Sequence, residues 1–275
     1  MEFDEKVVFI TGAARGQGRS HAVAFAEQGA DVIAVDMCEQ IQSVAYPMAR
    51  PVDLEGTVSL VQKAGRRIVA EQADVRDLGQ LQTVVADGVA MLGRLDFVVV
   101  NAGIGPIFGR QARQLSAYRD AVDVMLNGAV FTIEAALPAM LMHGDGGAIV
   151  ITSSSTAFKS ASPSYRSGSY GSVGYTAAKH GVVGVMRYYA HVLAEKNIRV
   201  NSVHPTGVAT PMAINEQAEQ HAGEYPEFGE MMQNLLPVPL IDASDITAAI
   251  MYLCGNSGRY VTGTTMRIDA GVTLK

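Results

Sequence analysis

The sequence predicts a single α/β domain in which seven parallel strands form one sheet with helices on both faces. Short continuous apolar runs recur along the chain, as in strands that are buried on both faces. Segments of about 10–15 residues with a helical pattern separate these runs, which is typical of βαβ units. The chain has 275 residues, 48% of them apolar, enough for one large core. No second composition, long linker or repeat marks another domain within residues 1–275.

Each expected element follows from its local pattern. The strands, read from the apolar runs, are residues 7–10, 31–36, a third that begins at 67–70, 95–100, 148–152, 198–203 and 265–269. The helices, read from the periodicity between the runs, are residues 19–28, 53–64, 78–92, 115–142 and one that begins near Tyr175. Pro138 is expected to bend the end of the long helix. Three segments are read as irregular: 37–52, 160–174 and the Met-, Glu- and Pro-rich region 211–240.

Composition narrows the function. A net charge of −6 argues against nucleic acid as a partner. Two cysteines, Cys38 and Cys254, are too few for a disulfide framework and suit a reducing compartment. The apolar run at 7–10 is too short for a signal peptide, and no 18-residue apolar stretch is expected to span a membrane, so we expect a cytoplasmic protein. No cluster of His, Cys and Asp has the spacing of a metal site.

A glycine-rich turn, TGAARGQG at 11–18, joins the first strand to the first helix. Glycines allow a tight turn and a close approach of the backbone to a ligand, and a helix N-terminus attracts pyrophosphate. Asp36 ends the next strand, where a carboxylate would bind the adenosine ribose and repel a 2′-phosphate. The glycine-rich turn and Asp36 together favour NAD over NADP as the cofactor, although Arg15 near the same ribose would oppose this preference. The alternatives are a plain βα turn and an Asp that only caps the following loop.

Tyr175 and Lys179 stand four residues apart at the expected start of a helix, so they share one face. An ammonium near a phenol favours the phenolate and lowers the phenol pKa from about 10 toward the working pH. Such a tyrosine can act as general acid or base on a secondary alcohol or ketone. The same spacing also occurs in ordinary polar pairs on helix surfaces, so the surrounding sequence has to decide.

Taken together, these residues resemble the short-chain dehydrogenase/reductase family over essentially the whole chain. The matching stretches, in the family's order, are residues 11–18, Asp36, Asp74-Val75, Asn101-Ala102-Gly103, Asn127, the serine run 153–155, Tyr175 with Lys179, and residues 201–205. Within the family the chain is most similar to the mycofactocin-associated subgroup typified by carveol dehydrogenases, through residues 35–49, 177–184, 201–212 and 234–239. The resemblance implies a Rossmann fold and NAD-dependent interconversion of a secondary alcohol and a ketone.

The resemblance also implies a role for individual residues. Tyr175 would exchange a proton with the substrate oxygen, and Lys179 would lower its pKa and hold the nicotinamide ribose. A serine hydroxyl would bind the substrate oxygen: counting from the strand gives Ser154, and counting back from the residues after the run gives Ser155. Asn127 would hold a water in a proton relay. The residues expected to contact NAD are Gly12, Arg15, Gly16, Gln17, Gly18, Asp36, Met37, Asp74, Val75, Asn101, Ala102, Gly103, Tyr175, Lys179, Val208 and Thr210.

Two segments are expected to cover the site. Residues 37–52 start beside the adenosine ribose, are mostly apolar and contain two prolines, so we expect them to cover the adenine end of NAD and slow its exchange. The alternative is that they pack only on the neighbouring helix. Residues 211–240 are expected to form a substrate lid. The resemblance further implies a homotetramer, supported by the apolar stretch 260–274, and a mycofactocin-like redox carrier that re-oxidises NAD in place.

The expected substrate is an apolar secondary alcohol, alicyclic or terpenoid. Two other classes of function remain open. One is a non-oxidative enzyme of the same fold, an epimerase or dehydratase, which tends to carry a longer C-terminal substrate domain. The other is a catalytically silent NAD-binding or regulatory protein, for which nothing would require Asn127, Ser154, Tyr175 and Lys179 together. His180 and His204 flank the key residues and are expected to be structural.

Overall fold

One parallel sheet of seven strands, in the order β3-β2-β1-β4-β5-β6-β7, forms the centre of the molecule. The computed structural model describes residues 1–275. All six strand pairings are parallel, which confirms the predicted doubly wound sheet. The strands are β1 Val7–Thr11, β2 Asp31–Asp36, β3 Ile68–Gln72, β4 Phe97–Val100, β5 Gly147–Thr152, β6 Ile198–Pro205 and β7 Thr265–Ile268.

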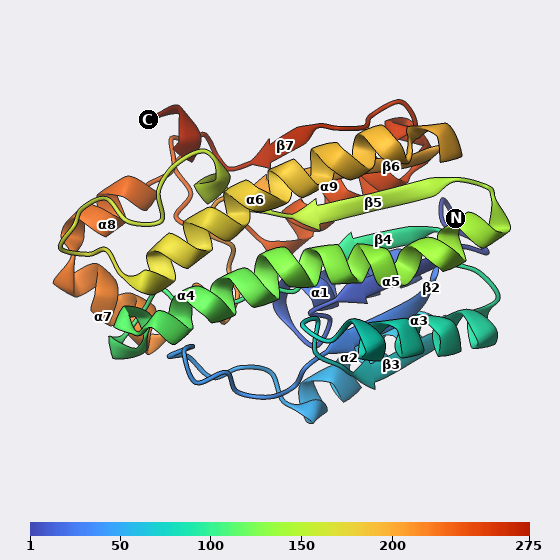
Figure 1. Cartoon of the computed structure of the whole chain (residues 1–275), viewed down its shortest axis with the longest axis horizontal. Helices are drawn as coiled ribbons and strands as arrows, with labels where there is room; N and C mark the ends of the chain where they lie inside the picture. The colour runs from blue at the N-terminus through green and yellow to red at the C-terminus, as the bar shows by residue number, and fades with distance from the viewer.

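Helices cover both faces of this sheet (Figure 1). They are α1 Gly16–Glu27, α2 Pro51–Lys63, α3 Leu78–Leu92, α4 Leu115–Val122, α5 Gly128–His143, α6 Tyr170–Val192, α7 Glu216–Glu224, α8 Pro226–Met232 and α9 Ala243–Cys254. Helix α1 contacts α2 and α9 on one face, while α3 contacts α5 and α4 contacts α6 on the other. Two separate hydrophobic clusters follow from this layering, one on each side of the sheet.

The strand order creates the place where a ligand can bind. β1 pairs with β2 on one side and with β4 on the other, so the chain crosses over in opposite directions from β1. The loops after β1 and β4 therefore separate at the carboxyl end of the sheet and leave a crevice, as in other doubly wound folds.

The long helix predicted at 115–142 is a composite. Helix α4 continues through a π-helical turn, Asp123–Asn127, into α5, which contains Pro138 and ends at His143. By length and composition Leu115–His143 is apolar enough to cross a membrane, contrary to the expectation that no stretch would qualify. More than half of its most apolar window, 56%, is buried inside the protein, as in a helix that covers a sheet.

Three helix starts differ from the predicted ones. Helix α1 already begins at Gly16, inside the glycine-rich turn. Helix α2 begins at Pro51, because the fixed φ of proline suits the first position of a helix, and the irregular segment ends two residues earlier than predicted. Helix α6 begins at Tyr170 behind the N-cap Ser169, so Tyr175 lies in its second turn rather than at its start.

The crossing of α4 and α6 gives a test of the packing. A Cβ at Gly174 of α6 would lie 2.8 Å from the Tyr118 carbonyl oxygen and 2.9 Å from Ala121 Cβ, whereas nothing lies within 4 Å of one at Gly184. We expect Gly174→Ala to destabilise the fold by about 1–3 kcal/mol through overpacking. Gly184→Ala in the same helix should stabilise it by about 0.5–1 kcal/mol. Denaturant unfolding of both variants measures the difference, and equal stabilities would contradict this packing.

Candidate active site

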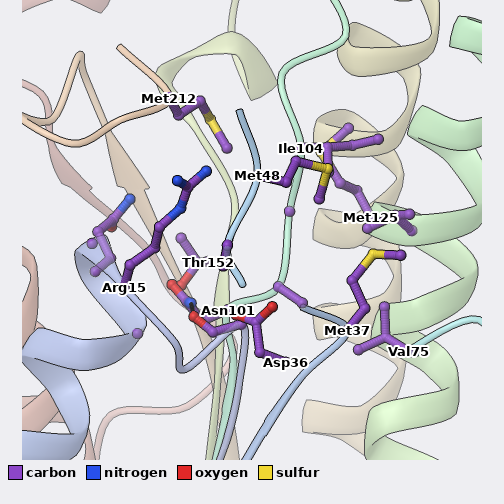
Figure 2. A pocket seen from close by; sticks show the side chains of 18 of the residues that line it. Arg15, Asp36, Met37, Met48, Val75, Asn101, Ile104, Met125, Thr152 and Met212 are labelled. Carbon is purple, nitrogen blue, oxygen red and sulfur yellow. Dashed lines mark hydrogen bonds between the residues drawn. The ribbon is translucent and has the colours of Figure 1, made fainter. Parts of the chain in front are cut away.

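A long pocket opens where the chain leaves the carboxyl ends of β1, β2, β4 and β5 (Figure 2). Of its 26 lining residues, 12 are hydrophobic. The pocket brings together most of the residues that were predicted to contact NAD: Gly12, Arg15, Gly16, Gln17, Gly18, Asp36, Met37, Asp74, Val75, Asn101, Ala102, Gly103, Tyr175, Lys179 and Thr210. Val208, Asn127 and Ser154 do not line it.

The glycine-rich turn forms a cradle at one wall of the pocket. Gly12 and Gly16 have φ of 68° and 55°, a conformation that suits glycine. A Cβ at Gly18 would lie 2.0 Å from the Gly12 carbonyl oxygen, so only glycine fits there. Gln17 Oε1 and Thr152 Oγ1 are buried in this pocket without a hydrogen-bond partner. A ligand with polar groups, such as a dinucleotide, fits a wall that leaves these atoms unpaired.

Asp36 lies at the end of β2 and faces this cradle (Figure 2). Its carboxylate accepts the backbone N–H of Ala14 at 3.0 Å and that of Cys38 at 3.2 Å, so it caps the following loop as well as lining the pocket. Burial raises its pKa, and the two backbone hydrogen bonds partly offset this effect. Arg15 Nη2 donates to the Pro47 carbonyl at 2.7 Å, so the side chain expected to oppose an NAD preference is engaged by the protein itself.

Two further predicted contacts have other partners. The Asp74 carboxylate forms an ion pair with Arg76, with 2.6 Å between Oδ2 and Nη2. Thr210 lines the pocket and donates its hydroxyl to the Val208 carbonyl. Val208 itself is buried, bridges to Ile241 and does not line the pocket, so only its backbone is placed to contact a cofactor.

Lys179 and Tyr175 lie at the other end of the pocket. Lys179 Nζ donates to the Thr152 carbonyl at 2.9 Å and lies 5.8 Å from the centre of the Tyr175 ring. Burial lowers the pKa of Lys179 to about 8. Burial also raises the pKa of Tyr175, and a hydrogen bond with Ser154 offsets this only in part. The direction of this shift is opposite to the lowering that the sequence predicts, because burial removes the phenolate from water and this effect exceeds that of Ser154.

The three serines have different environments. Ser153 Oγ donates to the Lys179 carbonyl at 2.8 Å, which supports helix α6. Ser154 lies close enough to the Tyr175 hydroxyl to lower its pKa, and Ser154 Oγ donates to Thr156 Oγ1 at 3.1 Å. Ser155 Oγ is buried without a partner. Of the two serines left open by the sequence, Ser154 is the one beside the tyrosine.

His204 forms a hydrogen bond with the backbone of Ser154. Its Nδ1 lies 3.1 Å from the Ser154 carbonyl oxygen, and its Nε2 lies 2.8 Å from Ser202 Oγ. Burial lowers the pKa of His204 to about 4, so the ring stays neutral and serves as a hydrogen-bonding spacer. His180 is exposed and bonds only the Thr176 carbonyl of its own helix.

Asn127 is the one expected catalytic residue that the structure turns away from the site. Its side chain is exposed and donates to Asp123 Oδ1 at 2.9 Å. From the same turn, Val124 and Met125 line the pocket instead, and a Cβ at Gly103 would lie 3.7 Å from both Met125 Sδ and Lys179 Nζ. Residues two apart on a helix point in nearly opposite directions, so a buried Met125 already excludes Asn127 from that face.

The irregular segment after β2, residues 37–50, is called the strap below. The Gln40 side chain holds it in shape: Nε2 donates to the carbonyls of Ile41, Val44 and Tyr46, and Oε1 accepts the N–H of Met48. Met37, Tyr46, Met48 and Ala49 line the pocket. Sequence reasoning expected the apolar side chains of this segment, Tyr46 and Met48 among them, to cover the adenine end of the cofactor, but it did not single out the ones that line the pocket.

The region 211–240, the expected lid, contains α7 and α8 and is fastened to neighbouring loops. Lys159 Nζ donates to the Met231 carbonyl at 2.6 Å, and Arg113 Nη2 to the Tyr225 hydroxyl at 3.1 Å. Met212 lines the pocket. Ile214, Leu235 and Leu236 are each more than half exposed, so only part of the expected apolar face reaches the pocket.

Comparison with known proteins agrees with this geometry. A family profile described as enoyl-(acyl carrier protein) reductase matches residues 12–273. An uncharacterized oxidoreductase of Mycobacterium tuberculosis is 48% identical over 98% of this chain and 97% of its own length. The (−)-trans-carveol dehydrogenase of Rhodococcus erythropolis is 41% identical over 98% of each chain. The crystal structure of carveol dehydrogenase from Mycobacterium avium in complex with NAD superposes with a TM-score of 0.90 and 43% identity, covering 100% and 99% of the two chains.

The exposed position of Asn127 predicts that its substitution has little effect on turnover. We expect Asn127→Ala to change turnover by no more than about twofold, the usual size of a surface substitution. Lys179→Met, which keeps the length of a buried side chain but removes its charge, should abolish turnover in parallel assays. A loss of more than about tenfold for Asn127→Ala, with normal thermal unfolding, would show that this residue reaches the site after all.

Proposed function

Because this chain belongs to the short-chain dehydrogenase/reductase family, we propose that it oxidises an apolar alicyclic or terpenoid alcohol of the carveol type to the ketone. It is an NAD-dependent oxidoreductase that acts on CH–OH donors. One observation supports the site assignment most: Tyr175 and Lys179 line one end of a pocket whose other end carries the glycine cradle and Asp36, and Ser154 lies beside Tyr175 just outside this lining.

In this proposal each residue either helps to transfer the proton or positions a reacting group. When bound, NAD supplies the hydride acceptor at the nicotinamide ring. Tyr175 exchanges a proton with the substrate oxygen; its raised pKa favours the phenol, the form that donates to a ketone. The Lys179 ammonium favours the phenolate, the form that accepts a proton from an alcohol. Ser154 orients the substrate oxygen, and His204 fixes the Ser154 backbone.

The wall of the pocket supports an apolar substrate. Ile104, Val124, Met125 and Met212 line it together with Tyr175. None of these four side chains can donate or accept a strong hydrogen bond. The reacting oxygen of the substrate is therefore the group that the site would recognise by polar contact. Methionine side chains adapt to ring systems of different outline, which suits an alicyclic alcohol better than a sugar.

We also propose that the strap holds NAD in place between turnovers. Its side chains Ile41, Val44 and Tyr46 are buried in the main hydrophobic cluster, which supports a fixed cover rather than a loose loop. The Arg15–Pro47 contact joins the strap to the glycine cradle across the pocket. A retained cofactor must be re-oxidised in place, so a separate redox carrier of the mycofactocin kind is part of the proposal.

The proposed assembly is a cytoplasmic homotetramer. Strand β7 lies at the edge of the sheet, and Tyr260 and Leu274 near the end of the chain are 88% and 74% exposed. Val173 and Tyr188 are also exposed on helix α6. Apolar side chains on an edge strand and on a long helix suit symmetric contacts between copies of one chain. The two cysteines are buried and unpaired, in keeping with a reducing compartment.

The first prediction concerns the acid/base residue. Tyr175→Phe should eliminate turnover and leave NAD affinity nearly intact, because it removes the hydroxyl and keeps the ring. Tyr165→Phe, at a fully exposed tyrosine, is the matched control and should behave as the wild type. Reduction of an artificial electron acceptor reports turnover, and calorimetry on protein freed of NAD reports binding. Retention of more than a few per cent of activity by Tyr175→Phe would remove this residue from the mechanism.

The second prediction concerns cofactor choice. Asp36→Ala should narrow the preference for NAD over NADP by about tenfold, or ~1.4 kcal/mol, since it removes a charge that repels the 2′-phosphate. Glu55→Ala, at an exposed residue of α2, changes the net charge equally and should leave the preference unchanged. Dissociation constants for both cofactors give the ratio. Equal wild-type affinity for NAD and NADP would contradict the argument.

The third prediction concerns retention. The protein should purify with NAD bound, show little steady-state oxidation with free NAD, and recover activity with an artificial electron acceptor. Gln40→Ala, which removes the hydrogen bonds that shape the strap, should lose NAD on dialysis while keeping the fold. Rapid multiple turnover of the wild type with free NAD, and cofactor loss on dialysis, would return it to the freely exchanging dehydrogenases.

A further inference from the structure

The strap carries a buried phenol into the pocket. Tyr46 is 3% exposed and lines the same pocket as Tyr175. Its hydroxyl oxygen accepts the backbone N–H of Gly105 at 3.0 Å. No group in the structure accepts the Tyr46 O–H in return. The Tyr46 hydroxyl oxygen therefore accepts one hydrogen bond, and its O–H is free to donate another inside the proposed cofactor pocket.

The location of Tyr46 indicates which part of the ligand it meets. The next residue, Pro47, is held by Arg15 from the glycine cradle, at the end of the pocket that contains Asp36. On its other side the ring contacts Gly105, which follows the pocket residues Asn101–Gly103. Arg15 and Tyr175 are both close enough to influence the Tyr46 pKa through their charges. Tyr46 thus lies between the adenosine end and the nicotinamide end of the pocket.

The chemistry of this position favours a hydrogen-bond donor. Burial raises the pKa of Tyr46 to about 12, so the phenol keeps its proton at any working pH and cannot serve as a second base. The middle of a dinucleotide is its diphosphate, whose oxygens carry charge and spare lone pairs. The N-terminus of α1, Gly16–Gly18, lines the same pocket and would attract the same group.

We propose that Tyr46 donates its phenolic hydrogen bond to a diphosphate oxygen of NAD. This inference rests on the proposed placement of NAD in the pocket. It gives one residue of the strap a specific hydrogen bond to the cofactor. A strap that only covered apolar surface would need no such bond. The strap then binds the cofactor by recognising its linkage as well as by enclosing it.

The loop after β4 holds Tyr46 in this position. Its Gly105 N–H donates to the Tyr46 hydroxyl, and a Cβ at Gly105 would lie 3.7 Å from Tyr46 Cε1 and 3.3 Å from Met212 Cγ of the lid. A Cβ at Gly109 would lie 2.9 Å from Ala45 Cβ of the strap and 3.1 Å from Gln217 Oε1 of α7. The loop after β4 therefore lies beside both the strap and the lid, and it sets the direction of the phenol.

Ligand fragments test the proposal. We compare wild type, Tyr46→Phe and the exposed-site control Tyr165→Phe, each freed of NAD, for calorimetric affinity toward adenosine, ADP and NAD. Tyr46→Phe should weaken ADP and NAD by a similar factor of about tenfold or more, the size expected for a hydrogen bond to a charged group, and should leave adenosine unchanged. Tyr165→Phe should match the wild type for all three.

Two results would overturn the proposal. Equal weakening of adenosine would show that Tyr46 only anchors the strap, through Gly105. Unchanged affinity for ADP would show that the donor does not meet the diphosphate. Thermal unfolding of the ligand-free variants separates a general loss of stability from a loss of contact. Since the readout is binding, it stands apart from turnover: failure of Tyr175→Phe to stop catalysis would refute the proposed mechanism and leave this result in force.

Discussion

The site depends on a small set of hydrogen bonds that hold the ends of β1 and β4 together. Thr11 Oγ1 accepts the N–H groups of Asn101 and Ala102, each at 3.1 Å, and Asn101 Nδ2 donates to the Thr11 carbonyl at 3.0 Å. Gly12 approaches Ala102 so closely that a Cβ would lie 2.9 Å from its Cα. These bonds occur where the sheet reverses its winding, and they set the distance between the glycine cradle and the catalytic end of the pocket.

Burial controls the electrostatics of that catalytic end. It lowers the pKa of Lys179 and His204 and raises that of Tyr175, in each case favouring the neutral form. A neutral His204 can support the Ser154 carbonyl without adding a charge behind it. With a pKa of about 8, Lys179 still carries its charge for most of the time at neutral pH, so its ammonium and any charge on a bound ligand together set the proton affinities at this end of the pocket.

The sequence predicts the fold well because the apolar runs and the glycine-rich turn favour their structures locally, and packing in the sheet preserves those structures. It also places the residues that follow strand ends, such as Asp36 and Asn101, since their position is set by the strand itself. It fails for Asn127, where the direction of a side chain depends on the rotation of a helix through a π-helical turn. It places Tyr46 in the expected cover but does not give the direction of its hydroxyl, because a segment without regular structure takes its shape from contacts with distant loops.

Four thioethers line the pocket: Met37, Met48, Met125 and Met212 (Figure 2). Sulfur is polarisable and the side chain has three flexible bonds, so this lining can shape itself to hydrocarbons of different outline. The same atoms are the oxidisable part of the cavity. Conversion of any of them to the sulfoxide would place a strong dipole in an apolar wall, so peroxide would attack the pocket at the same side chains that make this wall adaptable.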